Sequence, residues 1–139
     1  MNPYLRDKYG DRLRTIGIEV PITTTTGGTY YLPDDAILRG KEIVGAFIMG
    51  NPNDNANSPS GRPLASNNAV YSSFLTIKED NDNVLESHPL SDFLQTAEDR
   101  SYRILNQCNI NPQRSTIQVT NTSLISAGES FYLTFVYLV

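Results

Sequence analysis

The chain has 139 residues, the size of one ordinary domain, and its eleven basic and fifteen acidic side chains give a formal net charge of −4. Duplex nucleic-acid binders usually carry a basic excess, so this balance argues against that class. No apolar run approaches the ~20 residues of a membrane-spanning helix, and the polar, charged opening is not typical of a signal peptide.

Residues 1–14 are expected to form an amino-terminal arm or a short helix. Apolar residues make only a partial stripe along this segment. It carries a local charge of +2, from Arg6, Lys8, Arg12 and Arg14 against Asp7 and Asp11. A basic arm can contact phosphates or anionic lipid, and a solvated terminus or one docked on a partner is the simpler interpretation.

From Thr15 the apolar pattern alternates with a period of two, which predicts a half-buried strand. Its apolar face is expected to contain Ile16, Ile18, Val20 and Ile22. Threonine and glycine residues then break the pattern, and Lys41–Gly50 predicts a second strong strand. Because this strand is apolar on both faces, we expect it to lie between layers or beneath a partner.

The middle of the chain predicts a long loop, a third strand and one short helix. Asn51–Asn68 contains three prolines and is expected to lack regular structure. Val70–Glu79 predicts the strand, and Asp80–Asn83 has turn chemistry before a short strand over Val84–Glu86. Ser91–Asp99 predicts the helix, with Ser91 or Asp92 as its cap.

Three further strands are predicted over Ser101–Ile110, Ser115–Thr120 and Phe131–Val139. The last is apolar on both faces, so it should be central in its sheet or covered by another subunit. Together these elements predict an all-β chain: a single jelly roll or antiparallel β-sandwich of about eight strands with one short helix. We place the arm at 1–14 and the jelly-roll domain at 15–139.

No set of residues predicts catalysis, a cofactor or a metal, so we expect a protein that is not an enzyme. The lone histidine, His88, follows Ser87, but neighbouring strand residues point to opposite faces, and there is no Gly-x-Ser-x-Gly motif. Asp80–Asn83 resembles the start of a calcium loop but lacks the glycine and the glutamate of an EF-hand. An irregular calcium site there or at Asp34-Asp35 is less plausible than a plain acidic turn.

Cys108 is the single cysteine and lies in an apolar run, so we expect a reduced core thiol and synthesis in a reducing cytoplasm. Trp, the usual sugar-stacking residue, is absent, which counts against a glycosidase or a carbohydrate-binding module. Tyr is abundant in the predicted strands. Core packing explains some of these tyrosines, and interfaces with other subunits are a natural place for the rest.

The order of several short motifs resembles jelly-roll capsid proteins of tailless icosahedral phages of Bacteroidetes, the Finnlakevirus-like group. The motifs are Tyr31-Leu32-Pro33-Asp34, Leu38-Arg39-Gly40-Lys41-Glu42-Ile43-Val44-Gly45, Phe74-Leu75-Thr76-Ile77, Pro89-Leu90-Ser91-Asp92-Phe93 and the turn Ser123–Ser130. The resemblance covers roughly residues 15–139. Major capsid proteins of that group have two fused jelly rolls and about twice this length.

The resemblance therefore implies a single-jelly-roll penton or minor capsid protein of the virion, made in the host cytoplasm. It implies copies of the chain itself, as a pentamer, and the neighbouring major capsid protein as partners, with no small-molecule substrate. The basic arm would reach neighbouring subunits, the genome or an internal membrane. Two alternatives stay open: a trimeric head-fibre or decoration protein, and a glycan-binding β-sandwich module.

Overall fold

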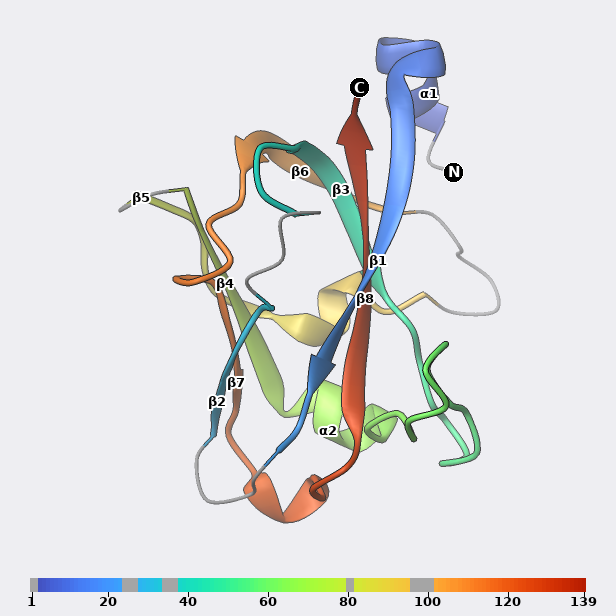
Figure 1. The fold of residues 1–139 in the computed structure, drawn as a ribbon, viewed down its shortest axis with the longest axis vertical. Helices are drawn as coiled ribbons and strands as arrows, with labels where there is room; N and C mark the ends of the chain where they lie inside the picture. Colours follow the sequence, from blue (N-terminus) through green and yellow to red (C-terminus); the bar gives the residue numbers. More distant parts are fainter. Residues whose placement is uncertain (1–2, 24–27, 34–37, 80–81, 96–101) are drawn as a thin grey trace.

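The computed structural model describes residues 3–23, 28–33, 38–79, 82–95 and 102–139. Within these residues, eight strands form two antiparallel four-stranded sheets that enclose one main core (Figure 1). The strands are β1 (Leu13–Pro21), β2 (Thr29–Tyr31), β3 (Glu42–Ile48), β4 (Ser73–Glu79), β5 (Asp82–Pro89), β6 (Arg103–Asn109), β7 (Thr116–Val119) and β8 (Ser130–Leu138). The helices are α1 (Pro3–Tyr9) and α2 (Asn67–Tyr71), with 3-10 turns η1 (Gly10–Arg12), η2 (Leu90–Phe93) and η3 (Thr122–Leu124).

The order of the strands identifies the topology. One sheet has the order β1-β8-β3-β6 and the other has the order β2-β7-β4-β5. The first strand therefore pairs with the last, the second with the seventh, the third with the sixth, and the fourth with the fifth. This nested pairing is that of a long hairpin wrapped around a core, which is the jelly roll. The all-β sandwich predicted from the sequence is confirmed.

Strands β1 and β8 supply much of the core because their alternation stays in register. Ile16 pairs with Phe135, Ile18 with Leu133, and Val20 with Phe131. Phe131, Leu133 and Phe135 are each no more than 2% exposed. The face predicted for β1 is therefore the face that packs in the core. No helix in the described residues is long and apolar enough to cross a membrane.

A β-bulge in β3 explains why its sequence is apolar on both faces. The pairing with β8 shifts between Ile43 and Gly45, so Val44 is an extra residue in the ladder. Ile43 and Ala46 then both belong to the core, while Val44 packs in a separate cluster outside it. Strict alternation would place Ile43 and Ala46 on opposite faces.

The structure corrects two predicted elements. The predicted strand Val70–Glu79 begins only at Ser73, because the residues before it form helix α2. Ala69 and Val70 of this helix are buried. The Ser66 hydroxyl caps the start of the helix by accepting a hydrogen bond from the Ala69 N–H. The predicted helix Ser91–Asp99 is a single 3-10 turn, η2, followed by extended Leu94; residues 96–99 lie outside the described part. One turn is enough to bury both Leu90 and Phe93.

The long loop predicted at Asn51–Asn68 is held by buried polar contacts. The Asn51 side chain, 1% exposed, donates from Nδ2 to the Leu64 carbonyl at 2.8 Å and accepts from the Ala56 N–H at 3.0 Å. One isolated bridge joins Asn57 to Pro63 within the loop, and the last two residues of the predicted loop begin α2. Proline thus excludes long strands here but does not prevent an ordered loop. Of the predicted turn Asp80–Asn83, Asp82 and Asn83 belong to β5, and residues 80–81 lie outside the described part.

Candidate functional site

The outer face of the β1-β8-β3-β6 sheet carries the features that distinguish this chain from a plain sandwich. The sequence left open whether β3 and β8 are apolar on both faces because they lie between layers or because a partner covers them. Both strands are interior strands of their sheet, with β8 between β1 and β3 and β3 between β8 and β6. Their inner face packs on the core, and part of their outer face is covered by the chain's own amino-terminal arm.

Helix α1 packs on this outer face through Leu5, with Tyr9 partly buried beside it. Leu5 is 0% exposed and packs with Val44, Val136 and Leu138 in a cluster separate from the main core. Gly45 makes room for it, since a β-carbon there would lie 3.1 Å from the Leu5 Cδ1 atom. We name Leu5, Val44, Val136 and Leu138 the arm cluster. It buries apolar surface that the strands would otherwise present to solvent or to a neighbour.

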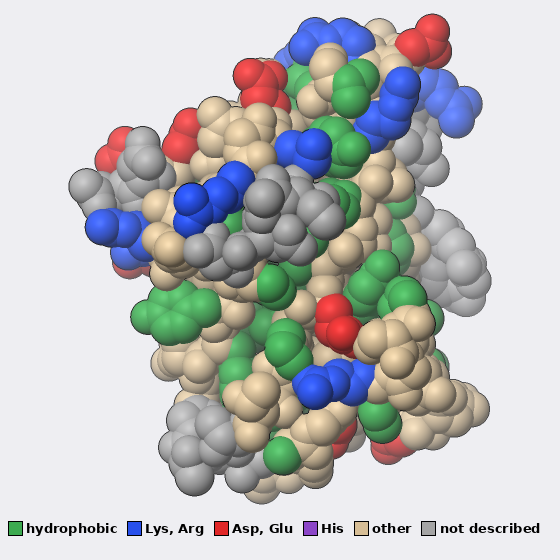
Figure 2. All heavy atoms as spheres, in the orientation of Figure 1, with side chains coloured by type: hydrophobic (Ala, Val, Ile, Leu, Met, Phe, Trp, Pro, Cys, Tyr) green, Lys and Arg blue, Asp and Glu red, His purple; other side chains and the backbone are tan. Residues whose placement is uncertain are grey.

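The basic side chains of the arm point away from the arm cluster. Figure 2 shows Lys and Arg side chains gathered at the end of the molecule that carries α1, with Asp and Glu side chains among them. Arg6, Lys8, Arg12 and Arg14 are all exposed. Arg14 donates to the main-chain carbonyls of Asp11 and Leu13, and Arg12 donates to the carbonyl of Val139. The predicted basic arm is therefore a docked segment with an exposed cationic side.

A hydrogen-bonded carboxylate joins the long loop to the outer face of β1. Glu19 accepts from the hydroxyls of Ser58, Ser60 and Ser130. Burial acts to raise the pKa of Glu19, but these hydrogen bonds and the positive charge of Arg62 outweigh it, so the pKa lies below its ordinary value. The ionised form of Glu19 thus holds the loop against the sheet.

Beside this loop the outer face is hollowed into an open groove of about 680 Å³. Phe47 and Tyr132 come from the floor strands β3 and β8, Tyr71 comes from α2, and Leu94 and Gln95 follow η2. Tyr71 is 64% exposed and Met49 39%, whereas Phe47 and Tyr132 are half-buried. We call this feature the aromatic groove. No sequence pattern identifies it, because its residues lie on four separate segments of the chain.

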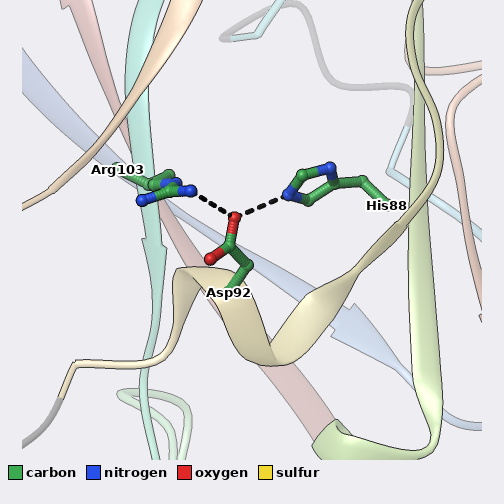
Figure 3. Close-up of polar contacts among 3 residues, drawn as sticks. All are labelled: His88, Asp92 and Arg103. Carbon is green, nitrogen blue, oxygen red and sulfur yellow. Dashed lines mark hydrogen bonds and ion pairs between the residues drawn. The ribbon is translucent and has the colours of Figure 1, made fainter.

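The sole histidine takes part in an ionic cluster rather than in a nucleophile–base pair. The Asp92 carboxylate accepts from His88 Nε2 at 2.7 Å and from an Arg103 guanidinium nitrogen at 2.9 Å (Figure 3). His88 is the next-to-last residue of β5, Asp92 lies in η2, and Arg103 begins β6, so the cluster bridges the edges of the two sheets. Arg103 is 56% exposed and the other two about one third, so the contribution to stability is small.

The other residues considered from the sequence are structural or lie outside the described part. Cys108 is buried, and burial together with the negative charge of Glu79 raises its pKa to about 11, which leaves the thiol protonated and unreactive. The Ser87 main-chain N–H donates to the Thr76 hydroxyl, and Ser87 adopts a left-handed φ of 47°. Of the two calcium candidates, Asp34-Asp35 and the first two residues of Asp80–Asn83 lie outside the described residues. No cluster of three metal-ligating side chains occurs among the described residues.

Comparison with known proteins identifies no relative. No protein-family model matches the chain, and no curated protein and no solved structure is significantly similar to it. The function has to be inferred from the fold and from the two features of its outer face, the arm cluster and the aromatic groove.

Proposed function

We propose that this chain is a structural subunit of an icosahedral virion, a penton or minor capsid protein built on a single jelly roll. The observation that carries the proposal is the nested strand order, β1-β8-β3-β6 facing β2-β7-β4-β5. Viral shell subunits are one of the major classes that use this order. Because a fold alone does not define a function, the motif resemblance from Tyr31 to Gly45 and over Ser123–Ser130 is the second support.

The edges of the two sheets provide the surfaces that such an assembly needs. Strands β1 and β6 end one sheet, and strands β2 and β5 end the other. Strand β5 is long and has exposed residues along most of its length. A ring of identical subunits needs two different surfaces per subunit that close under rotation. The four edge strands of the two sheets can supply these surfaces.

The arm gives the proposed subunit a second contact surface. Its apolar side is used within the chain, by Leu5, so its exposed cationic side is the part that can reach a partner. In a shell this side would contact neighbouring subunits, the genome or an internal membrane. Binding to anionic vesicles or to nucleic acid that disappears when Arg6 and Lys8 are both changed to Ala would identify the class of partner.

Native mass spectrometry of the purified chain and of virions tests the proposal. We expect pentamers, or five copies at each vertex of the particle. Three copies per assembly would instead identify a head fibre or decoration protein. A chain that stays monomeric at high concentration and is missing from the particles would contradict both virion roles.

A further inference from the structure

We propose that the aromatic groove is a binding site for a short neutral oligosaccharide. This function goes beyond a role in the shell and does not depend on it. The groove combines three exposed or half-exposed aromatic rings with a set of uncharged polar groups, at the size of an ordinary small-molecule site.

The aromatic side chains are the first observation. Phe47, Tyr71 and Tyr132 line one groove from three different segments, and Tyr71 is 64% exposed. Tyr71 lies at the end of α2 and not in a strand, so core packing does not account for its position. Aromatic faces stack on the C–H faces of sugar rings, and the tyrosine hydroxyls can add hydrogen bonds. The chain lacks Trp, and Tyr and Phe provide the same type of face with a smaller area.

The polar groups of the groove are uncharged and partly fixed in place. Asn67 and Gln95 contribute amides, and Thr134 contributes a hydroxyl. The Asn67 side-chain oxygen accepts from the Asn51 N–H at 2.6 Å, so the buried polar contacts of the loop position this amide. None of the described residues that line the groove is charged. An uncharged lining with amides and hydroxyls favours a neutral ligand that has many hydroxyl groups over an anion or a cation.

A glycine keeps the groove open. A β-carbon on Gly50 would lie 3.1 Å from the Leu94 Cδ1 atom and 3.2 Å from the Asn67 side-chain oxygen. Any larger residue would therefore press on two of the lining side chains. The volume of about 680 Å³ lies within the usual range for ligand sites, about 300–1,000 Å³.

The position of the groove in the sheet disfavours an extended peptide as the occupant. Peptides that add to a sheet need a free strand edge, with unpaired main-chain N–H and C=O groups. At the groove, Thr134 on β8 pairs with both Gly17 and Phe47, and Ile48 on β3 pairs with Leu133 and bridges to Leu94, so these strands offer no long unpaired edge there. Recognition in this groove has to use side chains, as is usual for sugars.

The test uses the purified full chain and a panel of neutral oligosaccharides of two to four sugars from the gluco, galacto, manno and N-acetylglucosamine series. Sialylated and sulfated members of the same panel serve as charged probes. We expect saturable binding of at least one neutral member, with a Kd below about 1 mM, and no comparable binding of the charged members.

Two variants and a matched control locate the binding. Tyr71→Ala should raise the Kd at least about tenfold, whereas Tyr71→Phe, which keeps the ring, should have a smaller effect. Tyr31→Ala is the control, because Tyr31 is similarly exposed, at 61%, but lies on β2 in the other sheet. Circular dichroism should show that all three variants fold.

Three results would overturn the proposal: no saturable binding of any neutral member, binding only of charged members, or binding that Tyr31→Ala weakens as much as Tyr71→Ala. Capture of a peptide by the groove, lost in Tyr71→Ala while no sugar binds, would also overturn it. None of these results bears on whether the chain is present in virions, so the two proposals can fail separately.

Discussion

The side chain of Tyr132 occupies the space above Gly17 on the neighbouring strand. A β-carbon on Gly17 would lie 1.8 Å from the Tyr132 hydroxyl oxygen and 2.4 Å from the ring carbon that carries it. No other residue type at position 17 would leave the tyrosine where it is. Because Tyr132 also lines the aromatic groove, a glycine on β1 sets the shape of a site formed mainly by β3, β8 and α2.

Changing Gly17 to Val should therefore alter the groove without unfolding the protein. The end of the Tyr132 side chain can swing away, and Val is favoured in strands, so the free energy of unfolding should change by less than about 1 kcal/mol. NMR should show shifted Tyr132 ring resonances, and oligosaccharide binding should weaken about tenfold or more. The control Thr15→Val places the same side chain on the same exposed face of β1. It should change neither the Tyr132 ring resonances nor oligosaccharide binding. Unchanged Tyr132 resonances in Gly17→Val would contradict the packing described.

The arm cluster predicts a large cost for truncating a leucine outside the sandwich. Leu5 is completely buried, so Leu5→Ala should lower the free energy of unfolding by about 2–3 kcal/mol if the arm unfolds together with the sheets. Urea unfolding measures this loss of stability. The main-chain amides of α1 and of the part of β8 beneath it should exchange hydrogen faster. Tyr4→Ala, at a position 51% exposed in the same helix, should cost less than about 0.5 kcal/mol. Equal effects of the two changes would show that the arm is not docked in solution.

Glu19 predicts a loss of stability in acid. Its folded pKa is lower than its unfolded pKa, so its contribution is complete above the ordinary glutamate value of about 4.3 and is lost as pH falls through the lower folded value. Glu19→Gln should remove this part of the pH dependence and cost about 1 kcal/mol at pH 7, where the serine hydroxyls lose a charged acceptor. Thermal unfolding of the wild type and of Glu19→Gln between pH 2 and pH 7 measures this pH dependence. If the melting temperatures of the two proteins fell in parallel as pH is lowered, the role given to the Glu19 carboxylate would be contradicted.

Cys108 predicts a loss of stability in base. Burial raises the folded pKa to about 11, above the ordinary value of about 9. Its contribution is therefore complete below pH 9 and is lost as pH rises from about 9 through 11, because the unfolded thiol ionises first. Cys108→Ala should lack this alkaline loss. At pH 8, a thiol reagent should label the folded protein far more slowly than the protein in guanidinium chloride, and rapid labelling of the folded protein would show that the thiol is accessible.

The sequence was sufficient for the fold class but not for the outer face. Alternation in β1 gives the buried face of that strand directly, since its pairing with β8 is unbroken. It fails in β3, where the bulge at Val44 places Ile43 and Ala46 in the same core. Part of the apolar second face of β3 and β8 is covered by Leu5 of the same chain. Leu5 lies more than thirty residues from either strand in sequence, so no local pattern indicates this contact.

Local sequence patterns do not indicate the aromatic groove or helix α2, for a related reason. Val70 and Tyr71 continue the apolar run of β4, and only Ser66, three residues before Ala69, indicates a helix start. Once Tyr71 is assigned to a strand, its exposure beside Phe47 and Tyr132 cannot be foreseen. Contacts between segments this far apart depend on topology, which local patterns do not specify.

The nested strand order also determines when the protein can fold. Strand β8 is made after the other seven described strands, yet it is an interior strand that joins β1 to β3. Until Ser130–Leu138 leaves the ribosome, β1 has no partner in its sheet and the apolar faces of β1 and β3 remain uncovered. Such distant pairing makes folding slow and leaves the growing chain open to aggregation. Production of this protein should therefore depend on how well the cell protects an unfinished chain.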